Sequence, residues 1–209
     1  MKSPFLVGVA GGSGSGKTLF ASAIKDKFEP SQVEIFSLDN YYKPIEEQPV
    51  DEWGVANFDR PESFYREKLK RDLENIKKGN DIEIPKYNFN INRGGKPEMI
   101  VVKAAPIVIV EGLFTFSFEE IVPLLDVKLF VDVPIWLMMK RRIQRDETER
   151  GYGDLKETMD RYENHVIPAF NEFVNYSKKD ADLIIPNHTN FDQALDIFTT
   201  YLKAKIARN

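Results

Sequence analysis

The chain has 209 residues, of which 42% are hydrophobic and 30% charged, and its formal net charge is −4. This is the composition of an ordinary globular protein, and the length suffices for one well-buried α/β domain. The acidic balance argues against a duplex nucleic-acid binder, and the lack of cysteine excludes disulfides and thiol chemistry. We see no leader sequence and no apolar run near the ~20 residues of a membrane span, so we expect a cytoplasmic protein without membrane contact.

The first strong pattern is a phosphate-binding loop. Residues 5–10 are apolar and predict a strand, and residues 19–24 open a helix. The stretch between them fits G-x-x-x-x-G-K-[ST], the P-loop pattern. It consists of Gly11, Gly12, Ser13, Gly14, Ser15, Gly16, Lys17 and Thr18. Free backbone amides and a helix N-terminus attract a polyphosphate there, so we predict that this loop binds ATP, with Lys17 on its phosphates and Thr18 on Mg²⁺.

Further strands and helices alternate along the rest of the chain. Strands are predicted at residues 33–38, 105–112, 127–133 and 181–186, and helices at residues 61–78, 134–149, 155–176 and 191–206. Asp59 is a candidate cap for the 61–78 helix, and Pro168 a candidate kink in the 155–176 helix. The alternation predicts a P-loop NTPase fold of the α/β class, a mostly parallel sheet flanked by helices, in a single domain over residues 1–209. Residues 81–103 predict an inserted β-hairpin that projects from this domain.

Two acidic residues follow predicted strands. Asp39 directly follows the predicted 33–38 strand. Glu111 directly follows the continuous apolar run of residues 105–110. The carboxyl ends of parallel strands meet at one edge of a sheet, so both side chains are expected beside the P-loop. Phosphoryl transfer needs a metal on the phosphates and a group that takes the proton of the attacking hydroxyl. We predict that Mg²⁺ lies near Thr18, Asp39 and Glu111, and that Asp39 also acts as the base.

Basic residues cluster after the 127–133 strand. The cluster comprises Arg141, Arg142, Arg145 and Arg150. In a helical lid of about residues 141–154, Arg145 and Arg150 can stabilise the transferring phosphoryl group together with Lys17. We interpret Arg141 as part of a solvated basic face. His165 and His188 are interpreted as structural or rim residues, since no spacing suggests a zinc site.

Seven segments in order resemble the uridine kinases, which are P-loop kinases related to phosphoribulokinase and pantothenate kinase. The segments are residues 11–18, 37–42, 57–61, 85–89 with Arg93, 110–112, 141–146 with 149–151, and 181–187. The resemblance implies that Asp39 is the base, that Asp59 holds the ribose hydroxyls and that Asn187 lies near the adenine. It also implies a homotetramer inhibited by a pyrimidine triphosphate.

The departures from that family fall where the base is read. Asn92 stands where uridine kinases carry a histidine in the hairpin, Tyr152 where they carry an arginine, and Arg161 near the place of a glutamine.

Together, the P-loop and the resemblance predict ATP-dependent phosphorylation of a nucleoside 5′-hydroxyl. The predicted substrate contacts are Asp39, Tyr41, Asp59, Tyr87, Asn92, Arg93 and Arg142. Two alternatives stay open: a kinase for another hydroxylated small metabolite, and an ATP-binding regulatory protein with little turnover.

Overall fold

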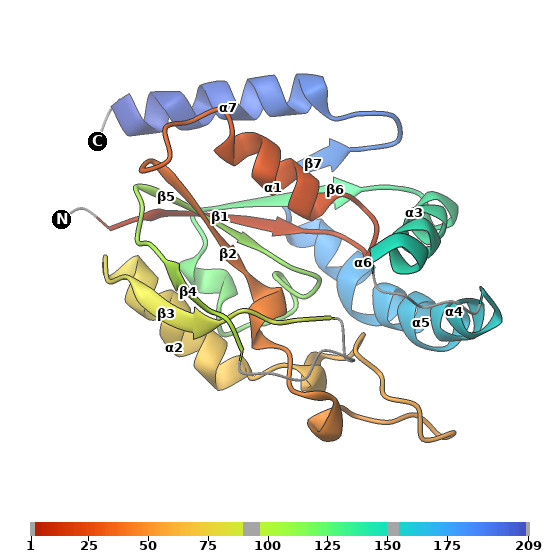
Figure 1. The fold of residues 1–209 in the computed structure, drawn as a ribbon. Helices are drawn as coiled ribbons and strands as arrows, with labels where there is room; N and C mark the ends of the chain where they lie inside the picture. Colours follow the sequence, from red (N-terminus) through yellow and green to blue (C-terminus); the bar gives the residue numbers. More distant parts are fainter. Residues whose placement is uncertain (1–2, 90–96, 150–154, 208–209) are drawn as a thin grey trace.

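A parallel sheet forms the centre of the molecule (Figure 1). The computed structural model describes residues 3–89, 97–149 and 155–207. The main sheet has the order β2-β5-β1-β6-β7, and each neighbouring pair of strands is parallel. Its strands are β1 (Phe5–Ala10), β2 (Val33–Ser37), β5 (Ile107–Glu111), β6 (Val127–Asp132) and β7 (Leu183–Pro186). The predicted α/β P-loop NTPase fold is confirmed, and every residue of β5 is buried, as its apolar run indicates.

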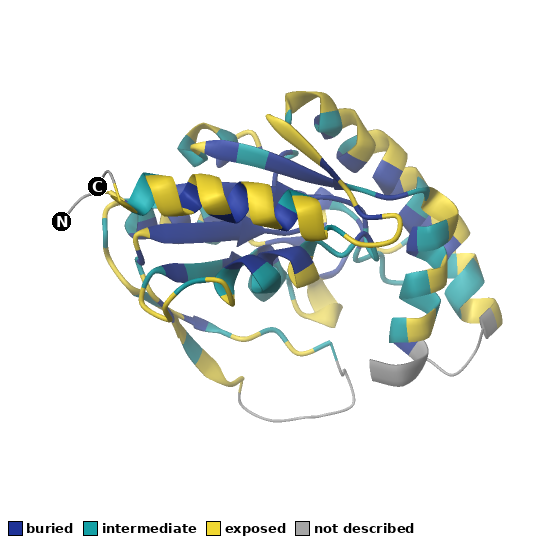
Figure 2. Cartoon of the chain, turned by 90° about the horizontal axis from the view of Figure 1, so that it is seen from above, coloured by how far each residue is buried: buried dark blue, intermediate teal, exposed yellow. Residues whose placement is uncertain are grey.

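Helices cover both faces of this sheet. Helices α1 (Lys17–Lys25) and α7 (Asp192–Ala207) pack on one face, and α2 (Arg66–Lys77) on the other (Figure 1). Alternate residues of each strand point to opposite faces, so Leu6 joins the core beneath α2 while Val7 joins the core beneath α1 and α7. Each fully buried apolar side chain contributes about 1.5–3 kcal/mol. Figure 2 shows the buried strands between helices whose outer faces are exposed.

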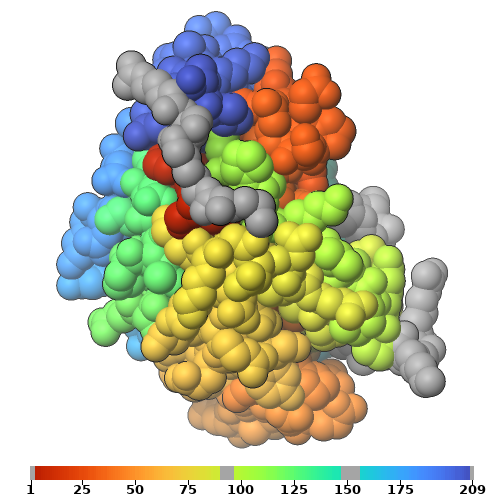
Figure 3. All heavy atoms as spheres, turned by 90° about the vertical axis from the view of Figure 1, so that its left-hand side faces the viewer, coloured from red at the N-terminus to blue at the C-terminus, as the bar shows by residue number. Residues whose placement is uncertain are grey.

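The predicted hairpin stands apart from the main sheet. Strands β3 (Ile82–Pro85) and β4 (Met99–Val102) pair antiparallel in a sheet of their own. Ile84 and Val102 anchor it to the core beneath α2. In Figure 3, α2 and this hairpin cover much of the side that faces the viewer. The connection between the two strands, residues 90–96, lies outside the described residues.

The predicted helix over residues 61–78 is divided in the structure. A 3₁₀ turn at Pro61–Ser63 precedes α2, and Phe64 between them is extended. Phe64 is buried and bridges to Tyr42, and backbone hydrogen bonds join Lys43 to Ser63 and Tyr65 to Tyr41. These long-range contacts outweigh the local helical preference.

A helical layer lies beyond the carboxyl edge of the sheet (Figure 1). It begins with α3 (Ile135–Glu149) and α4 (Leu155–Arg161), and continues through α5 (Ile167–Ala169) and α6 (Asn175–Ser177). Pro168 lies in α5, and π-helical turns at Tyr162–Val166 and Phe170–Val174 flank α5 on both sides. These wider turns accommodate a residue that has no backbone N–H, and the chain stays helical on both sides of Pro168. Among the described residues, no helix is both long and apolar enough to cross a bilayer.

Candidate active site

The P-loop joins β1 to α1 with a backbone that requires glycine. Gly14 and Gly16 have φ angles of 83° and 92°, and Gly16 caps the start of α1. A Cβ on Gly14 would lie 2.5 Å from the backbone oxygen of Met138 in α3, and a Cβ on Gly16 would lie 2.5 Å from Nδ2 of Asn187. Both positive φ and close neighbours therefore exclude larger residues. The loop is tightly enclosed with its amides at the N-terminus of α1, which is the arrangement that binds a phosphate.

Asn187 and Arg141 contact the backbone of the P-loop. Asn187 is buried and donates a hydrogen bond from Nδ2 to the Ser15 oxygen over 2.9 Å. Arg141 donates from Nη2 to the Asn187 oxygen over 3.1 Å and lies 3.5 Å from the Ser15 oxygen through Nη1. The interpretation of Arg141 as a solvated basic residue is therefore wrong, because its guanidinium reaches the loop backbone. Nothing in the local sequence distinguishes it from an exposed arginine.

The register of the sheet gathers oxygen atoms beside the P-loop. Glu111 pairs with Val9 of β1 and Ser37 of β2. Its Oε2 accepts a hydrogen bond from the Thr18 hydroxyl over 3.0 Å, and its Oε1 accepts one from the Ser37 hydroxyl over 2.6 Å. Ser37 was missed in the sequence analysis, because its role appears only once the two strands are known to be neighbours. Asp39 follows two residues later, with its N–H donating to the Ser37 hydroxyl oxygen over 3.3 Å.

Glu111 is buried at this edge among other charged groups. Its side chain is about 1% exposed, and burial raises its pKa. The charge of Asp39 raises the pKa further, while Lys17 and the hydroxyls of Ser37 and Thr18 lower it. Asp39, Glu111 and Lys17 therefore share one electrostatic environment.

The side-chain oxygen atoms at this edge suit a magnesium ion that is also coordinated by phosphates. Thr18, Asp39 and Glu111 offer oxygen atoms, which hard cations prefer. Within residues 3–89, 97–149 and 155–207, no cluster of three or more His, Cys, Asp or Glu side chains could hold a metal by itself. Mg²⁺ characteristically uses one or two carboxylates and completes its shell with substrate phosphates and water. The residues present fit that mode of binding.

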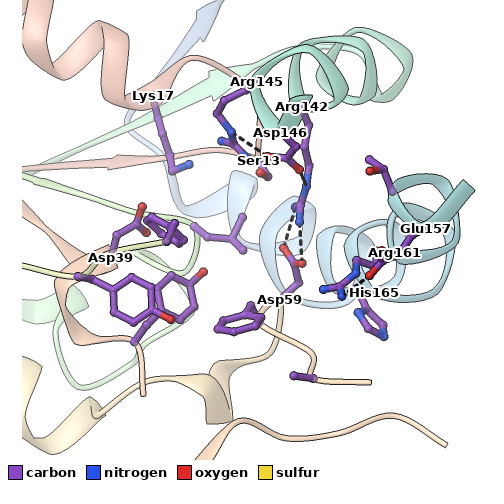
Figure 4. A pocket seen from close by; sticks show the side chains of 17 residues that line it. Ser13, Lys17, Asp39, Asp59, Arg142, Arg145, Asp146, Glu157, Arg161 and His165 are labelled. Carbon is purple, nitrogen blue, oxygen red and sulfur yellow. Dashed lines mark hydrogen bonds and ion pairs between the residues drawn. The ribbon is translucent and has the colours of Figure 1, made fainter. Parts of the chain in front are cut away.

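A pocket of about 950 Å³, including its open mouth, extends from the P-loop along the helical layer (Figure 4). Lys17 and Asp39 lie at one end, Asp59 lies in the middle, and Arg161 and His165 lie at the other end. Aromatic side chains complete the wall: Tyr42, Phe58, Tyr87 and Phe89. The pocket therefore has a charged end at the P-loop, an apolar wall and a second polar end.

An ion pair between Asp59 and Arg142 crosses the middle of the pocket. Arg142 Nη1 and Nη2 lie 3.2 and 3.3 Å from the two Asp59 oxygens, and its Nε lies 3.4 Å from Asp146. Burial lowers the pKa of Arg142, but the charges of Asp59 and Asp146 outweigh burial and raise it overall. The prediction that Asp59 caps a helix is wrong, because the following 3₁₀ turn has no side-chain cap and the carboxylate faces Arg142.

The structure corrects one predicted substrate contact. The Tyr41 side chain is 1% exposed, stacks on Phe36 and donates its hydroxyl hydrogen bond to Asp72 of α2. Tyr41 is therefore a core residue and does not line the pocket. The next residue, Tyr42, lines it instead, because successive side chains around this turn point in different directions.

Tyr87 is held at the pocket by the segment after β2. Its N–H donates to the Asn40 side-chain oxygen over 3.1 Å, and its ring centroid lies 5.3 Å from that of Tyr42. This contact joins the segment after β3 to the residues that follow Asp39. The structure thus brings four of the predicted site residues to the same pocket: Tyr87, Asp39, Asp59 and Arg142.

Several further candidates come from the helical layer and the hairpin. Arg145 lines the pocket and donates to Asp146, and Arg161 lines it with its Nη2 2.7 Å from Glu157. Four positions singled out in the sequence lie outside the described residues: Asn92, Arg93, Arg150 and Tyr152.

The two histidines differ in their surroundings. His188 is exposed, whereas His165 is buried, lines the pocket and lies 2.8 Å from an oxygen of Asp51. Asp51 was not considered in the sequence analysis. The two residues are 114 positions apart, so no local pattern connects them.

Strand, glycine-rich loop, Lys-Thr and helix at the carboxyl edge of a parallel sheet define a P-loop NTPase fold. Within this class, the profile of the family described as "Phosphoribulokinase / Uridine kinase family" matches residues 6–194. The chain belongs to that family.

Individual relatives agree with this assignment. The chain is 37% identical over 199 residues to a uridine kinase of Borrelia garinii subsp. bavariensis. The match covers 95% of this chain and 94% of the relative. It is 31% identical over its full length to uridine kinase-like protein 5 of Arabidopsis thaliana, but spans only 44% of that relative. A structure described as a possible uridine kinase from Bacillus stearothermophilus superposes with a TM-score of 0.64 at 17% identity, covering 88% of this chain and 89% of that one. The structural likeness supports the fold.

Proposed function

We propose that this chain transfers the terminal phosphoryl group of ATP to the 5′-hydroxyl of a pyrimidine nucleoside, with Mg²⁺ as cofactor. The observation that carries the proposal is one continuous pocket. It contains the P-loop lysine, the candidate base Asp39 and a wall of aromatic and ion-paired side chains that suits a nucleoside. The uridine kinases among the relatives support the choice of acceptor.

The reaction needs few groups from the protein. The 5′-oxygen forms a bond to the terminal phosphorus, the bond from that phosphorus to the bridging oxygen of ADP breaks, and the hydroxyl proton passes to the Asp39 carboxylate. Lys17 and Arg145, which line the pocket, stabilise the charge on the transferring group. Mg²⁺, when bound, neutralises phosphate charge, and Thr18 and Glu111 are the residues that hold it.

The rest of the pocket orients the acceptor. Asp59 accepts hydrogen bonds from the ribose hydroxyls, since its ion pair with Arg142 leaves lone pairs on both carboxylate oxygens. The nucleobase packs against the rings of Tyr42 and Tyr87, whose centroids are 5.3 Å apart. This orientation places the 5′-hydroxyl at the Asp39 end and the base toward Arg161 (Figure 4).

A direct test is ADP release from ATP and Mg²⁺ with a panel of acceptors. The panel contains uridine, cytidine, purine nucleosides, pantothenate and sugar phosphates. We expect uridine or cytidine to give the highest kcat/KM. Activity with another acceptor and none with the pyrimidine nucleosides would refute the nucleoside assignment. Tight ATP binding without turnover on any acceptor would refute the kinase assignment altogether.

A further inference from the structure

A short turn before the pocket is organised by one carboxylate. We call residues 49–57 the 49–57 turn: Val50 and Ala56 form an antiparallel bridge across it. Asp51 Oδ1 accepts hydrogen bonds from the N–H groups of Trp53 and Val55, over 3.0 and 2.8 Å. The Asp51 backbone N–H also donates to the Val55 oxygen over 2.9 Å. One oxygen of Asp51 therefore holds two amides of the turn, which backbone hydrogen bonds also close.

The other oxygen of Asp51 makes a long-range contact. Its Oδ2 lies 2.8 Å from Nε2 of His165, whose side chain is 5% exposed. Burial raises the pKa of Asp51, but the hydrogen bonds from His165 and from the turn amides hold it below its usual value. His165 belongs to the π-helical turn at Tyr162–Val166. Such turns are rare and often occur at functional sites, because they displace side chains from the regular helical register.

The turn leads directly into the acceptor pocket. Ala56 in the turn lines the pocket, as do Phe58 and Asp59 directly after it. Asp59 is itself joined to the helical layer through Arg142. The stretch from Asp51 to Asp59 is thus attached to the helical layer at both of its ends, and the pocket-lining residues lie between or at the attachment points. Trp53 at the tip is 65% exposed, so the tip itself is not held by packing.

We propose that Asp51 and His165 form a clasp that fixes residues 51–59 against the helical layer and thereby sets the affinity for the acceptor. Both act here as positioning residues: Asp51 does not line the pocket, and His165, which does, acts by holding Asp51 and thereby Phe58 and Asp59. The proposal rests on the proposed function, since it takes the pocket to be the nucleoside site. Opening the clasp frees one end of the pocket wall and leaves the P-loop, Lys17 and Thr18 unchanged, so it weakens acceptor binding more than ATP binding.

The kinetic test compares His165→Ala, His165→Gln and the unmodified protein. Loss of a hydrogen bond to a charged group predicts an acceptor KM about tenfold higher in His165→Ala, with kcat and the KM for ATP within about twofold. Glutamine can donate to the same Asp51 oxygen, so His165→Gln recovers at least half of the change in KM on a logarithmic scale. An unchanged acceptor KM in His165→Ala, or no recovery in His165→Gln, overturns the clasp. Glu120→Gln, which breaks an ion pair remote from the pocket, serves as the control with normal kinetics.

A second measurement detects the clasp without turnover. The chain has two tryptophans, so in a Trp136→Phe background Trp53 in the 49–57 turn is the sole tryptophan and can be excited selectively at wavelengths where tyrosine does not absorb. We expect its fluorescence anisotropy, without any ligand, to fall in His165→Ala and to return toward the original value in His165→Gln. Equal anisotropy in all three proteins overturns the clasp whatever the kinetics. Absence of nucleoside turnover in the unmodified protein refutes the proposed function instead, and the anisotropy still decides the clasp.

Discussion

Replacing Arg142 by leucine removes the cation from a buried ion pair of the pocket. The side chains of Asp59 and Asp146 are 9% and 7% exposed, and Arg142 contacts both. Asp146 keeps its contact with Arg145, whereas Asp59 loses both hydrogen bonds from the guanidinium. The cost of the substitution is therefore dominated by one uncompensated carboxylate in a poorly hydrated position.

Breaking a buried pair by removal of one partner typically costs about 3–5 kcal/mol. For a chain of this length, that lowers Tm by about 6–20 °C. Thermal and urea unfolding, followed by circular dichroism, measure the change. Lys86→Met is the matched control, because the Lys86–Glu98 pair is exposed on both sides and is worth less than about 1 kcal/mol.

A second variant separates the charge from the lost packing. Asn at position 59 carries no charge, so the double variant Asp59→Asn, Arg142→Leu is expected to be more stable than Arg142→Leu alone. If Arg142→Leu costs no more than Lys86→Met, or if the double variant is less stable than the single one, the buried charge is not the source of the effect and the reasoning fails.

Three other outcomes follow from the same structure. Gly16→Ala should abolish ATP binding in calorimetry, because φ is positive there and a Cβ meets Asn187; normal affinity would contradict the loop geometry. Asn187→Leu should weaken ATP binding about tenfold by releasing the Ser15 oxygen, and an unchanged Kd would deny Asn187 that supporting role. Burial raises the pKa of Glu120, but hydrogen bonds from Arg66 lower it below its usual value. Its stabilisation is therefore complete above the unfolded pKa and is lost as pH falls through the folded pKa, so Glu120→Gln should show a shallower loss of stability between about pH 5 and pH 3 in urea melts.

The sequence predicts the sheet and the P-loop because both depend on local patterns. The apolar run that ends at Glu111 indicates a buried parallel strand, and the strand ends place Asp39 and Glu111 on the P-loop edge. The spacing of the glycines in the P-loop predicts the phosphate site from the local sequence alone. Ser37 was not predicted, because its contact with Glu111 depends on which strands are adjacent, and that order is not encoded in the spacing.

The acceptor end of the pocket is less predictable from sequence. Whether Tyr41 or Tyr42 faces the pocket depends on a 3₁₀ turn of four residues, which the pattern does not reveal. Arg141 and His165 acquire partners far along the chain, at Asn187 and Asp51. Each of these contacts joins loops and helices from different parts of the chain, so only the folded arrangement reveals them.

The most direct test of the nucleoside kinase proposal is the rate of phosphoryl transfer from ATP to uridine in Asp39→Asn. Asparagine preserves the size of the side chain but cannot take the proton of the attacking hydroxyl. We predict that kcat falls by about 10²- to 10⁴-fold, whereas ATP binding measured by calorimetry stays within about twofold. A kcat close to that of the unmodified protein would remove Asp39 as the base and contradict the proposed mechanism.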